Sequence, residues 1–199
     1  MHSSTNQHWS QVYKQERDFQ LISSQEIDSF LKYELPDAPK TGLDLGCGTG
    51  QLTRELYHRG YSLIGVDASE EAVQRAARLT NVSSQRLTYL QADLERDDLK
   101  QQLAALAPFG LVTCKLVYAF IKDKPAFLEK LKQMLHPQGL FVVITPLLED
   151  VEDHKKVIAV SSDDLQLLEI YFQQVAMDRV KGLTYFVGRP KLAAVSHTK

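Results

Sequence analysis

The chain has 199 residues, with 23 Lys and Arg against 25 Asp and Glu and a formal net charge of −2. This length fits one domain with a real hydrophobic core, and the near balance of charge excludes a global basic field for nucleic acid or an anionic membrane. Because the chain has two cysteines and no leader or membrane-spanning run in its sequence, we expect a soluble cytoplasmic protein with reduced thiols and no metal site.

The first 36 residues predict a helical arm ahead of the core. Aromatic residues spaced among charged ones, Trp9 and Tyr13 among them, indicate an amphipathic helix or an ordered arm over about residues 9–20. Ser23 and Glu26 have the spacing of a capping box, which predicts a second helix that ends near Pro36. We therefore expect a single domain over 1–199, with an arm at 1–36 and a core at 40–190.

Within the core, short apolar runs typical of buried strands alternate with amphipathic segments typical of helices. The predicted strands are 41–45, 62–67, 87–90, 111–114, 140–144, 173–180 and 184–187. The predicted helices are 51–59, one capped by Ser69, 97–106, one opened by Asp123 and Pro125, and one capped by Ser162 that runs to about Tyr171.

Two glycines mark turns between these elements. Gly139, in the turn 137–139, is expected to supply a positive φ, and Gly182 is expected to close a tight hairpin between the last two strands. The alternation predicts an α/β fold with a doubly wound, mostly parallel seven-stranded sheet. One antiparallel strand comes from the C-terminal hairpin, and helices cover both faces.

A glycine turn with the spacing G-x-G-x-G, at Gly46, Gly48 and Gly50, directly follows the first predicted strand. Such strand–turn–helix junctions hold nucleotide-like ligands against the backbone. Asp44 precedes the turn, and a carboxylate there repels a pyrophosphate but suits a ligand with hydrogen-bond donors or positive charge. The glycine spacing also differs from that of a dinucleotide site.

Polar residues also end or follow the next three strands, and in a doubly wound sheet the ligand lies at those carboxyl ends. Asp67 stands about twenty residues beyond the turn, the spacing of an acid that accepts hydrogen bonds from ribose hydroxyls, although it would also suit an acid that solvates a loop. Asp93 could accept a bond from an adenine amino group, with the Leu94 backbone donating to the ring, or could cap the next helix. Lys115 follows the fourth strand.

Four segments in order, at 43–50, 65–69, 91–94 and 135–139, resemble the successive motifs of class I S-adenosylmethionine-dependent methyltransferases. The resemblance covers about residues 40–146. It implies S-adenosylmethionine as cofactor, with Asp44 at the methionine amino end, Asp67 on ribose, Asp93 on adenine, and the backbone of Cys114 and Lys115 along the methionyl part. The implied cofactor-binding residues are Asp44, Gly46, Cys47, Gly48, Gly50, Asp67, Ala68, Asp93, Leu94, Cys114 and Lys115.

The implied reaction is an in-line displacement at the cofactor methyl group, in which the protein supplies positioning and a dry site. No catalytic base is evident from the sequence. Tyr118 is the one polar tip in the apolar loop 116–121, where pocket lining or packing is favoured over catalysis, and His154 is expected at the surface.

The acceptor is expected to be a small or medium-sized organic molecule. The family's amino-methyltransferase signature, Asn or Asp followed by Pro-Pro-Tyr or Phe, is absent after the fourth strand, which counts against nucleobase or amide methylation. Lysines are spread out and do not form a stripe. The sequence therefore predicts no nucleic-acid or membrane partner, and a monomer or a homodimer.

The sequence also predicts a role for the N-terminal arm and leaves two alternative functions open. Trp9, Tyr13 and Arg17 are predicted to fold over the cofactor as a lid, although simple packing of the aromatics on the sheet edge has comparable weight. A protein that binds S-adenosylmethionine without catalysis, as a sensor or partner subunit, is one alternative. An NAD-dependent dehydrogenase is the other, and Asp44 and the glycine spacing disfavour it.

Overall fold

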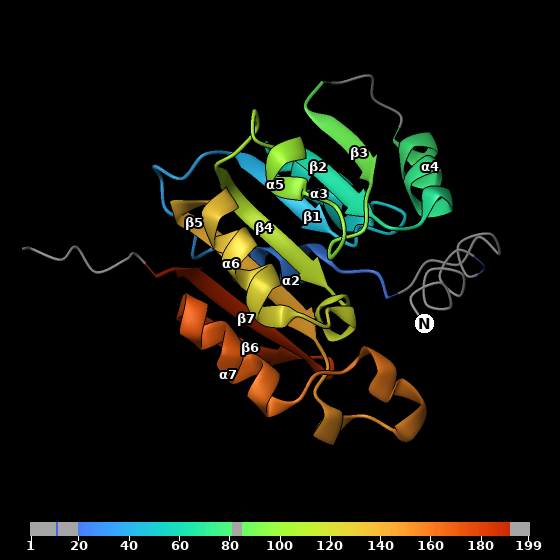
Figure 1. The fold of residues 1–199 in the computed structure, drawn as a ribbon, viewed down its shortest axis with the longest axis vertical. Helices are drawn as coiled ribbons and strands as arrows, with labels where there is room; N and C mark the ends of the chain where they lie inside the picture. Colours follow the sequence, from blue (N-terminus) through green and yellow to red (C-terminus); the bar gives the residue numbers. More distant parts are fainter. Residues whose placement is uncertain (1–10, 12–19, 81–84, 192–199) are drawn as a thin grey trace, which may run out of the picture.

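The computed structural model describes residue 11 and residues 20–80 and 85–191. Its centre is a seven-stranded sheet with the order β3-β2-β1-β4-β5-β7-β6 (Figure 1). The strands are β1 Thr41–Leu45, β2 Ser62–Asp67, β3 Leu87–Gln91, β4 Phe109–Lys115, β5 Leu135–Thr145, β6 Phe172–Val180 and β7 Leu183–Pro190. β7 pairs antiparallel with β5 and β6, and the other pairs are parallel. The predicted fold class is confirmed.

Helices cover both faces of this sheet. They are α2 Ser24–Leu31, α3 Gln51–His58, α4 Glu70–Leu79, α5 Leu99–Gln102, α6 Lys124–Met134 and α7 Ser162–Tyr171. Three short 3₁₀ turns lie between them, η1 Tyr118–Phe120, η2 Leu148–Asp150 and η3 Asp153–Ile158. In Figure 1, α6 lies in front of the sheet and α2 behind it. The sheet therefore lies between two helical layers.

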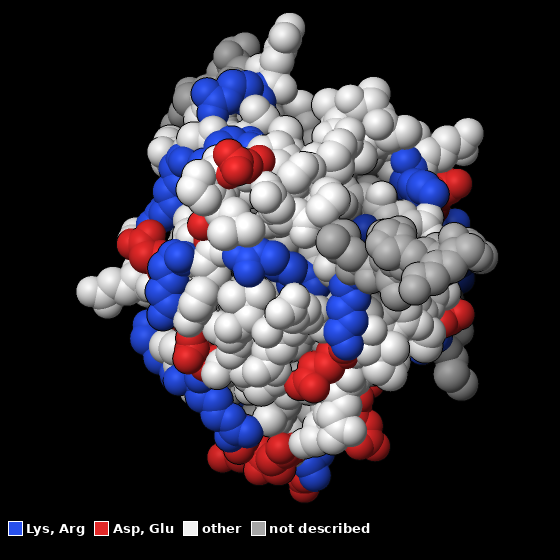
Figure 2. Space-filling view, turned by 90° about the vertical axis from the view of Figure 1, so that its left-hand side faces the viewer, with Lys and Arg blue, Asp and Glu red and all other residues white. Residues whose placement is uncertain are grey.

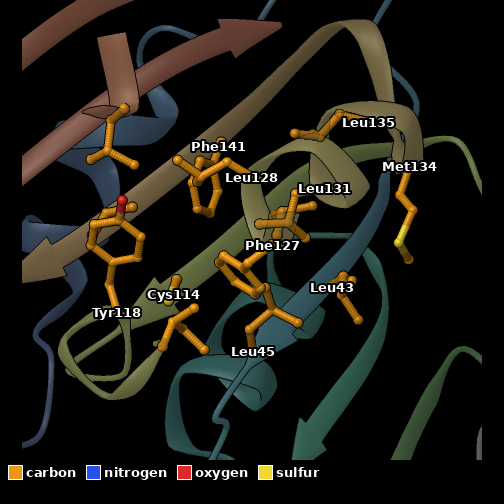
Figure 3. Packing of buried hydrophobic residues seen from close by; sticks show 14 of the residues in the cluster. Leu43, Leu45, Cys114, Tyr118, Phe127, Leu128, Leu131, Met134, Leu135 and Phe141 are labelled. Atoms are coloured by element: carbon orange, nitrogen blue, oxygen red, sulfur yellow. The ribbon is translucent and has the colours of Figure 1, made fainter. Parts of the chain in front are cut away.

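The two layers bury separate sets of apolar side chains. On the face of α5, α6 and α7, Phe127, Leu128 and Leu131 pack over β4 and β5, and the same cluster reaches Leu43 and Leu45 of β1 (Figure 3). On the other face, Ile27 and Phe30 of α2 and Leu52 and Leu56 of α3 pack against alternate residues of the same strands. Since burial of each large apolar side chain contributes about 1.5–3 kcal/mol, both layers stabilise the sheet.

Polar residues begin most helices, as the sequence predicts. The Ser69 hydroxyl accepts a hydrogen bond from the Ala72 amide, and Asp123 does the same for Ala126. The cap of α7 is Ser161 and not the predicted Ser162: the Ser161 hydroxyl accepts from Asp164 N, and the Asp164 carboxylate accepts from Ser161 N. This reciprocal pair decides the start of the helix.

The sequence prediction for Gly139 was wrong. Positive φ occurs at five described glycines, Gly46, Gly48, Gly50, Gly60 and Gly182, and Gly139 is not among them. β5 already begins at Leu135, with a register shift against β4 between Phe109 and Leu111. A Cβ at Gly139 would lie 2.8 Å from the Phe109 carbonyl oxygen. Glycine is needed there because β4 approaches closely, not because of a turn.

Two predicted helices are shorter than expected. α5 covers four residues instead of 97–106, because Ala104 N and Leu106 N bond to the carbonyls three residues back, as in turns. α2 ends at Leu31, well before Pro36, because Tyr33 N and Glu34 N bond in the same way. The predicted Gly182 turn is confirmed, with Lys181 at φ 51° and Gly182 at φ 77°.

Acidic and basic side chains are intermixed on the face that lies to the left in Figure 1, as Figure 2 shows for the described residues. Among the described residues as a whole, several basic groups have acidic partners, for example Lys40 with Glu34 and Arg59 with Asp28. In the described parts of the chain, no helix has the length and apolar character needed to cross a membrane.

Candidate functional site

The glycine turn after β1 is held tightly against β2. The amides of Gly46 and Cys47 both donate to the Val66 carbonyl, at 2.7 and 3.0 Å. Gly46 has φ +67°, and a Cβ there would lie 2.1 Å from Val117 Cγ2. Only glycine fits this position, because both the backbone angle and the neighbouring side chain exclude a larger residue. Gly50, with φ +76°, begins α3.

Asp44 lies beneath this turn, between the sheet and α3. Its carboxylate is 2 % exposed and accepts hydrogen bonds from Thr53 Oγ1 at 2.6 Å and from Thr113 Oγ1 at 2.7 Å. Burial raises the pKa of Asp44, and the two hydroxyls and the Lys115 ammonium oppose that rise. Asp44 thus joins β1 to α3 and to β4. The sequence predicts only a ligand contact for Asp44, because its spacing to Thr53 and Thr113 carries no periodic signal.

Asp67, at the end of β2, is half-buried and faces the turn. Its Oδ2 accepts from Gly48 N and its Oδ1 from Ser69 N, both at 2.9 Å. Burial raises the pKa of Asp67, and these two backbone donors oppose the rise. Each carboxylate oxygen has a further lone pair for a donor from a ligand. Asp67 therefore links the glycine turn to the start of α4 and still has the capacity to accept from hydroxyl groups.

Asp93, two residues beyond β3, accepts hydrogen bonds from the turn that follows it. Its Oδ1 accepts from Glu95 N at 3.0 Å and from Arg96 N at 3.4 Å, and Arg96 Nε lies 3.8 Å from Oδ2. The alternative that Asp93 caps the next helix was wrong, because α5 begins at Leu99 and its cap is Asp98, whose carboxylate accepts from Gln101 N at 3.1 Å. Leu94 packs against the core of the α6 face, and the Ala68 carbonyl accepts from Gln91 Nε2 at 3.4 Å. These residues form the rim of the site beside β3.

The strand order arranges the polar residues in a row along one edge of the sheet. β3, β2, β1 and β4 are neighbours in that order, and Asp67 pairs in register with Gln91 while Leu45 pairs with Cys114. Asp93, Asp67, the glycine turn and Lys115 therefore follow one another across four adjacent strand ends. Parallel strands bring such groups to the same edge, which is where doubly wound folds bind ligands.

The two cysteines differ in exposure at this edge. Cys47, in the turn, is half-buried, and burial together with the charges of Asp67 and Asp44 raises the pKa of its thiol well above the ordinary value. Cys114, at the end of β4, is fully buried, and burial raises its thiol pKa as well. Both thiols are protonated at neutral pH, so they contact their surroundings as small apolar groups.

The segment before α2 crosses this edge of the sheet. The Lys115 ammonium donates to the Gln20 carbonyl. The Gln51 side-chain amide pairs with the Ile22 backbone, donating to its carbonyl at 2.9 Å and accepting from its amide at 3.2 Å. The first residue of α3 and the last residue of β4 therefore hold residues 20–22 in place. Spacing alone did not reveal the Gln51 contact.

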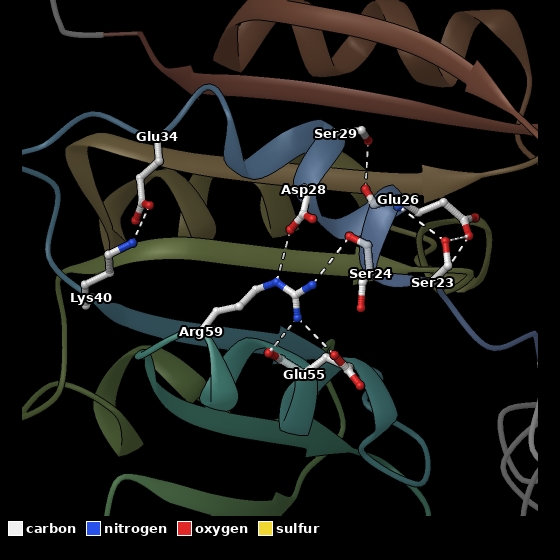
Figure 4. Close-up of polar contacts among 9 residues, drawn as sticks. All are labelled: Ser23, Ser24, Glu26, Asp28, Ser29, Glu34, Lys40, Glu55 and Arg59. Carbon is white, nitrogen blue, oxygen red and sulfur yellow. Dashed lines mark hydrogen bonds and ion pairs between the residues drawn. The ribbon is translucent and has the colours of Figure 1, made fainter.

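α2 is fixed to the rest of the domain by charged contacts. Arg59, just beyond α3, donates to the Asp28 carboxylate, to the Ser24 carbonyl and to Glu55 (Figure 4). Glu26, of which 7 % is exposed, accepts from Tyr185 Oη at 2.8 Å and from Lys181 Nζ at 3.0 Å. The capping box predicted from Ser23 and Glu26 is present.

The pKa of Glu26 reflects these contacts. Burial raises it, but hydrogen bonds from Ser23, Lys181 and Tyr185 outweigh burial and lower the pKa to about 2. The carboxylate is therefore charged at neutral pH and ties α2 to the β6–β7 hairpin. The sequence predicts only a helix-capping role for Glu26, because Lys181 and Tyr185 are more than 150 residues away in the chain.

The two residues considered as catalytic bases lie outside the row of polar groups. Tyr118 is fully buried against Phe127, and its hydroxyl donates to the Asp164 carbonyl at 3.3 Å, as expected for packing. The His154 side chain is 67 % exposed, with Glu152 3.4 Å away. Trp9, Tyr13 and Arg17 lie outside the described residues. Among the described residues, no cluster of three His, Cys, Asp or Glu side chains could hold a metal ion.

Comparison with known proteins adds a family match. A family model described as "Methyltransferase domain" matches residues 14–195. The chain is 31 % identical over 150 residues to a putative methyltransferase, YqeM, of Bacillus subtilis (strain 168), an alignment that covers 72 % of this chain and 56 % of that protein. The chain spans about half or less of the length of the curated relatives it matches.

Solved structures share the fold at low sequence identity. An S-adenosylmethionine-dependent methyltransferase from Anabaena variabilis has a TM-score of 0.72 at 14 % identity, covering 95 % of this chain and 94 % of that one. The N-methyltransferase NodS from Bradyrhizobium japonicum, in complex with S-adenosyl-L-homocysteine, has a TM-score of 0.66 at 18 % identity, covering 85 % of this chain and 89 % of that one.

Proposed function

The chain belongs to the methyltransferase domain family, as its motifs predicted, and we propose that it transfers the methyl group of S-adenosylmethionine to a small or medium-sized organic acceptor. One observation carries the proposal. The order Asp93, Asp67, glycine turn and Lys115 across β3, β2, β1 and β4 matches the order of adenine, ribose and an amino acid in one extended ligand.

The described side chains fit this cofactor in charge and hydrogen bonding. Asp67 would accept from the ribose hydroxyls, and the rim at Asp93 and Leu94 would receive the adenine. The glycine turn allows close approach of a ligand to the backbone, and the buried Asp44 carboxylate lies below it. A negative group beneath the turn favours a cationic sulfonium compound over a pyrophosphate. Ala68 and the backbone of Cys114 would complete the walls.

When bound, the cofactor supplies a methyl group already activated by its positively charged sulfur. The protein then has to orient the acceptor toward the cofactor and to exclude water. The high effective concentration of the oriented groups is the principal source of the rate acceleration. The Asp44 contacts with Thr53 and Thr113 hold β1, α3 and β4 in one arrangement around the turn. Asp44 thereby acts on the site through the position of the backbone and through its charge.

The N-terminal arm is proposed to cover the cofactor. Residues 20–22, which follow the arm, cross the carboxyl edge and are held by Gln51 and Lys115. Gln20, where the described part of this segment begins, therefore lies close to the site.

The same proposal includes a cytoplasmic location, a monomeric or homodimeric state, and no nucleic-acid or membrane partner, in keeping with the balanced charge of the chain.

Two measurements test the proposed function. Isothermal titration calorimetry with S-adenosylmethionine and with NAD should give binding for the first compound only; the opposite result would support a dehydrogenase. Incubation with isotopically labelled S-adenosylmethionine and a metabolite extract should then yield a labelled product identified by mass spectrometry. Cofactor binding without any labelled product would favour the non-catalytic sensor or partner subunit.

A further inference from the structure

Lys115 is a half-buried lysine at the carboxyl end of a central parallel strand. It is the last residue of β4, one step beyond the Cys114–Leu45 pair, so it lies level with Gly46 of the glycine turn. Side chains alternate along a strand, so Lys115 points to the same face as Thr113, which bonds to Asp44. The stem of Lys115 is half-buried, and burial lowers the pKa of its ammonium while the charges of Asp44 and Glu26 oppose that change.

The contact that Lys115 makes is weaker than the group allows. Its ammonium donates to the neutral backbone carbonyl of Gln20. In the described parts of the chain, each carboxylate that forms an ion pair with a lysine or arginine is paired with a residue other than Lys115. The bond to Gln20 has one charged partner, whereas a bond between an ammonium and a carboxylate adds the attraction between two opposite charges. A ligand carboxylate that reached this amine would therefore compete well with the Gln20 carbonyl.

Asp44 and Lys115 carry opposite charges on adjacent strands, since Thr113, two residues before Lys115, pairs with Asp44 in register and bonds to its carboxylate. The Asp44 carboxylate lies beneath the turn, and the Lys115 ammonium lies at the adjoining strand end, where each influences the pKa of the other. A free amino acid group has a positive ammonium and a negative carboxylate on one carbon. The pair of protein charges is complementary to that group, whereas a ligand that ended in a neutral alkyl group would leave Lys115 with its backbone partner.

On the basis of the proposed function, we propose that the Lys115 ammonium binds the carboxylate of the cofactor's amino-acid end, taking it in place of the Gln20 carbonyl. Lys115 is then a specificity residue of the cofactor site, acting through its side chain and not only its backbone. It lets the site distinguish S-adenosylmethionine from adenosyl sulfonium compounds that lack the carboxylate, and it couples cofactor binding to the segment at residues 20–22.

The decisive comparison uses two ligands that differ only in this group, S-adenosylmethionine and decarboxylated S-adenosylmethionine. Calorimetry on the wild-type chain should show binding of the first about 10- to 100-fold tighter than the second. In Lys115→Met, which keeps an unbranched side chain, the ratio should fall to within about 3-fold through loss of affinity for S-adenosylmethionine alone. Lys100→Met, which removes an exposed lysine bonded to Gln133, should keep the wild-type ratio.

A second measurement on the unaltered chain covers the case in which Lys115→Met fails to fold. Acylation of lysines followed by mass spectrometry should show Lys115 protected by S-adenosylhomocysteine but not by saturating 5′-methylthioadenosine, which lacks the amino-acid end, with Lys100 unaffected by either. Equal protection by both compounds, or an unchanged ligand ratio in Lys115→Met, would overturn the assignment while leaving the methyltransferase proposal intact. Failure of the wild-type chain to bind S-adenosylmethionine at all would overturn both.

Discussion

The Thr53 hydroxyl donates a 2.6 Å hydrogen bond to the Asp44 carboxylate and so joins the first turn of α3 to β1 beneath the glycine turn. Asp44 is buried, and an unsatisfied buried carboxylate is costly. This bond therefore fixes the helix that begins directly after the candidate cofactor-binding turn.

Thr53→Val should destabilise the domain. Valine has nearly the same shape but no hydroxyl, so the Asp44 carboxylate loses the 2.6 Å bond from that group, at a cost of about 1–3 kcal/mol. Urea unfolding followed by circular dichroism gives the free energy of unfolding. Thr88→Val, on the exposed side of β3, is the matched control and should stay within about 0.5 kcal/mol of wild type. Equal effects of both changes would contradict the structural role of Asp44.

Gly46→Ala should be more harmful than Gly60→Ala. Both glycines have positive φ, which costs alanine about 1–2 kcal/mol, but the new Cβ at Gly60 meets open space. At Gly46 it meets Val117 Cγ2, and the overlap adds about 1–3 kcal/mol. Denaturant unfolding of the two variants measures the difference. The double change Gly46→Ala with Val117→Ala should recover part of the loss, and no recovery would exclude the clash as its cause.

Glu26 should stabilise the fold in a pH-dependent manner. Its pKa is about 2 in the folded protein against an ordinary value of 4.5. A depressed carboxyl pKa contributes stability that is fully present above the unfolded pKa, so this contribution should be lost as pH falls from about 4.5 to about 2.

Glu26→Gln tests this dependence. The variant should be less stable than wild type at pH 7 by about 1.5–3 kcal/mol, because hydrogen bonds from Ser23, Tyr185 and Lys181 to a charged group are lost. The difference between the two proteins should shrink as pH falls through that window, as followed by thermal unfolding. Glu55→Gln, at a more exposed ion pair, should change stability by about 0–1 kcal/mol. A difference that is constant with pH would contradict the assignment.

Asp67→Ala should weaken the binding of S-adenosylmethionine by about 2 kcal/mol, through loss of a charge-assisted contact with the ribose. Because Asp67 also accepts from the Gly48 and Ser69 amides, calorimetry must be accompanied by a thermal unfolding curve taken at the same pH. Glu70→Ala, an exposed acid in the first turn of α4, is the control for lost negative charge. Undiminished affinity in Asp67→Ala would contradict the ribose assignment.

Removal of residues 1–19 should reduce cofactor affinity if the arm is a lid. This truncation keeps Gln20, so the carbonyl that bonds to Lys115 and the Ile22–Gln51 pair stay in the chain. Calorimetric titration with S-adenosylhomocysteine compares the truncated and the full chain. Unchanged affinity together with lower thermal stability would instead support packing of Trp9 and Tyr13 on the sheet edge.

The sequence by itself determined the architecture and the family. Alternating apolar and amphipathic runs predicted the succession of strands and helices along the chain. The G-x-G-x-G turn, with Asp44, Asp67 and Asp93 at successive strand ends, identified the family that the match over residues 14–195 supports. Short-range signals were also readable: the caps at Ser69 and Asp123 and the Gly182 turn depend on neighbours within a few residues.

Contacts between distant parts of the chain were decided only by the tertiary structure. Asp44 meets Thr113, Glu26 meets Tyr185, and Lys115 meets Gln20 across separations that carry no periodic signal. At Gly139 the local turn rule failed, because glycine is required there by the close approach of β4, which is distant in the sequence. A sequence pattern reports which face a residue occupies, but the partner of a buried polar group depends on how the layers pack, and that packing decides how the site works.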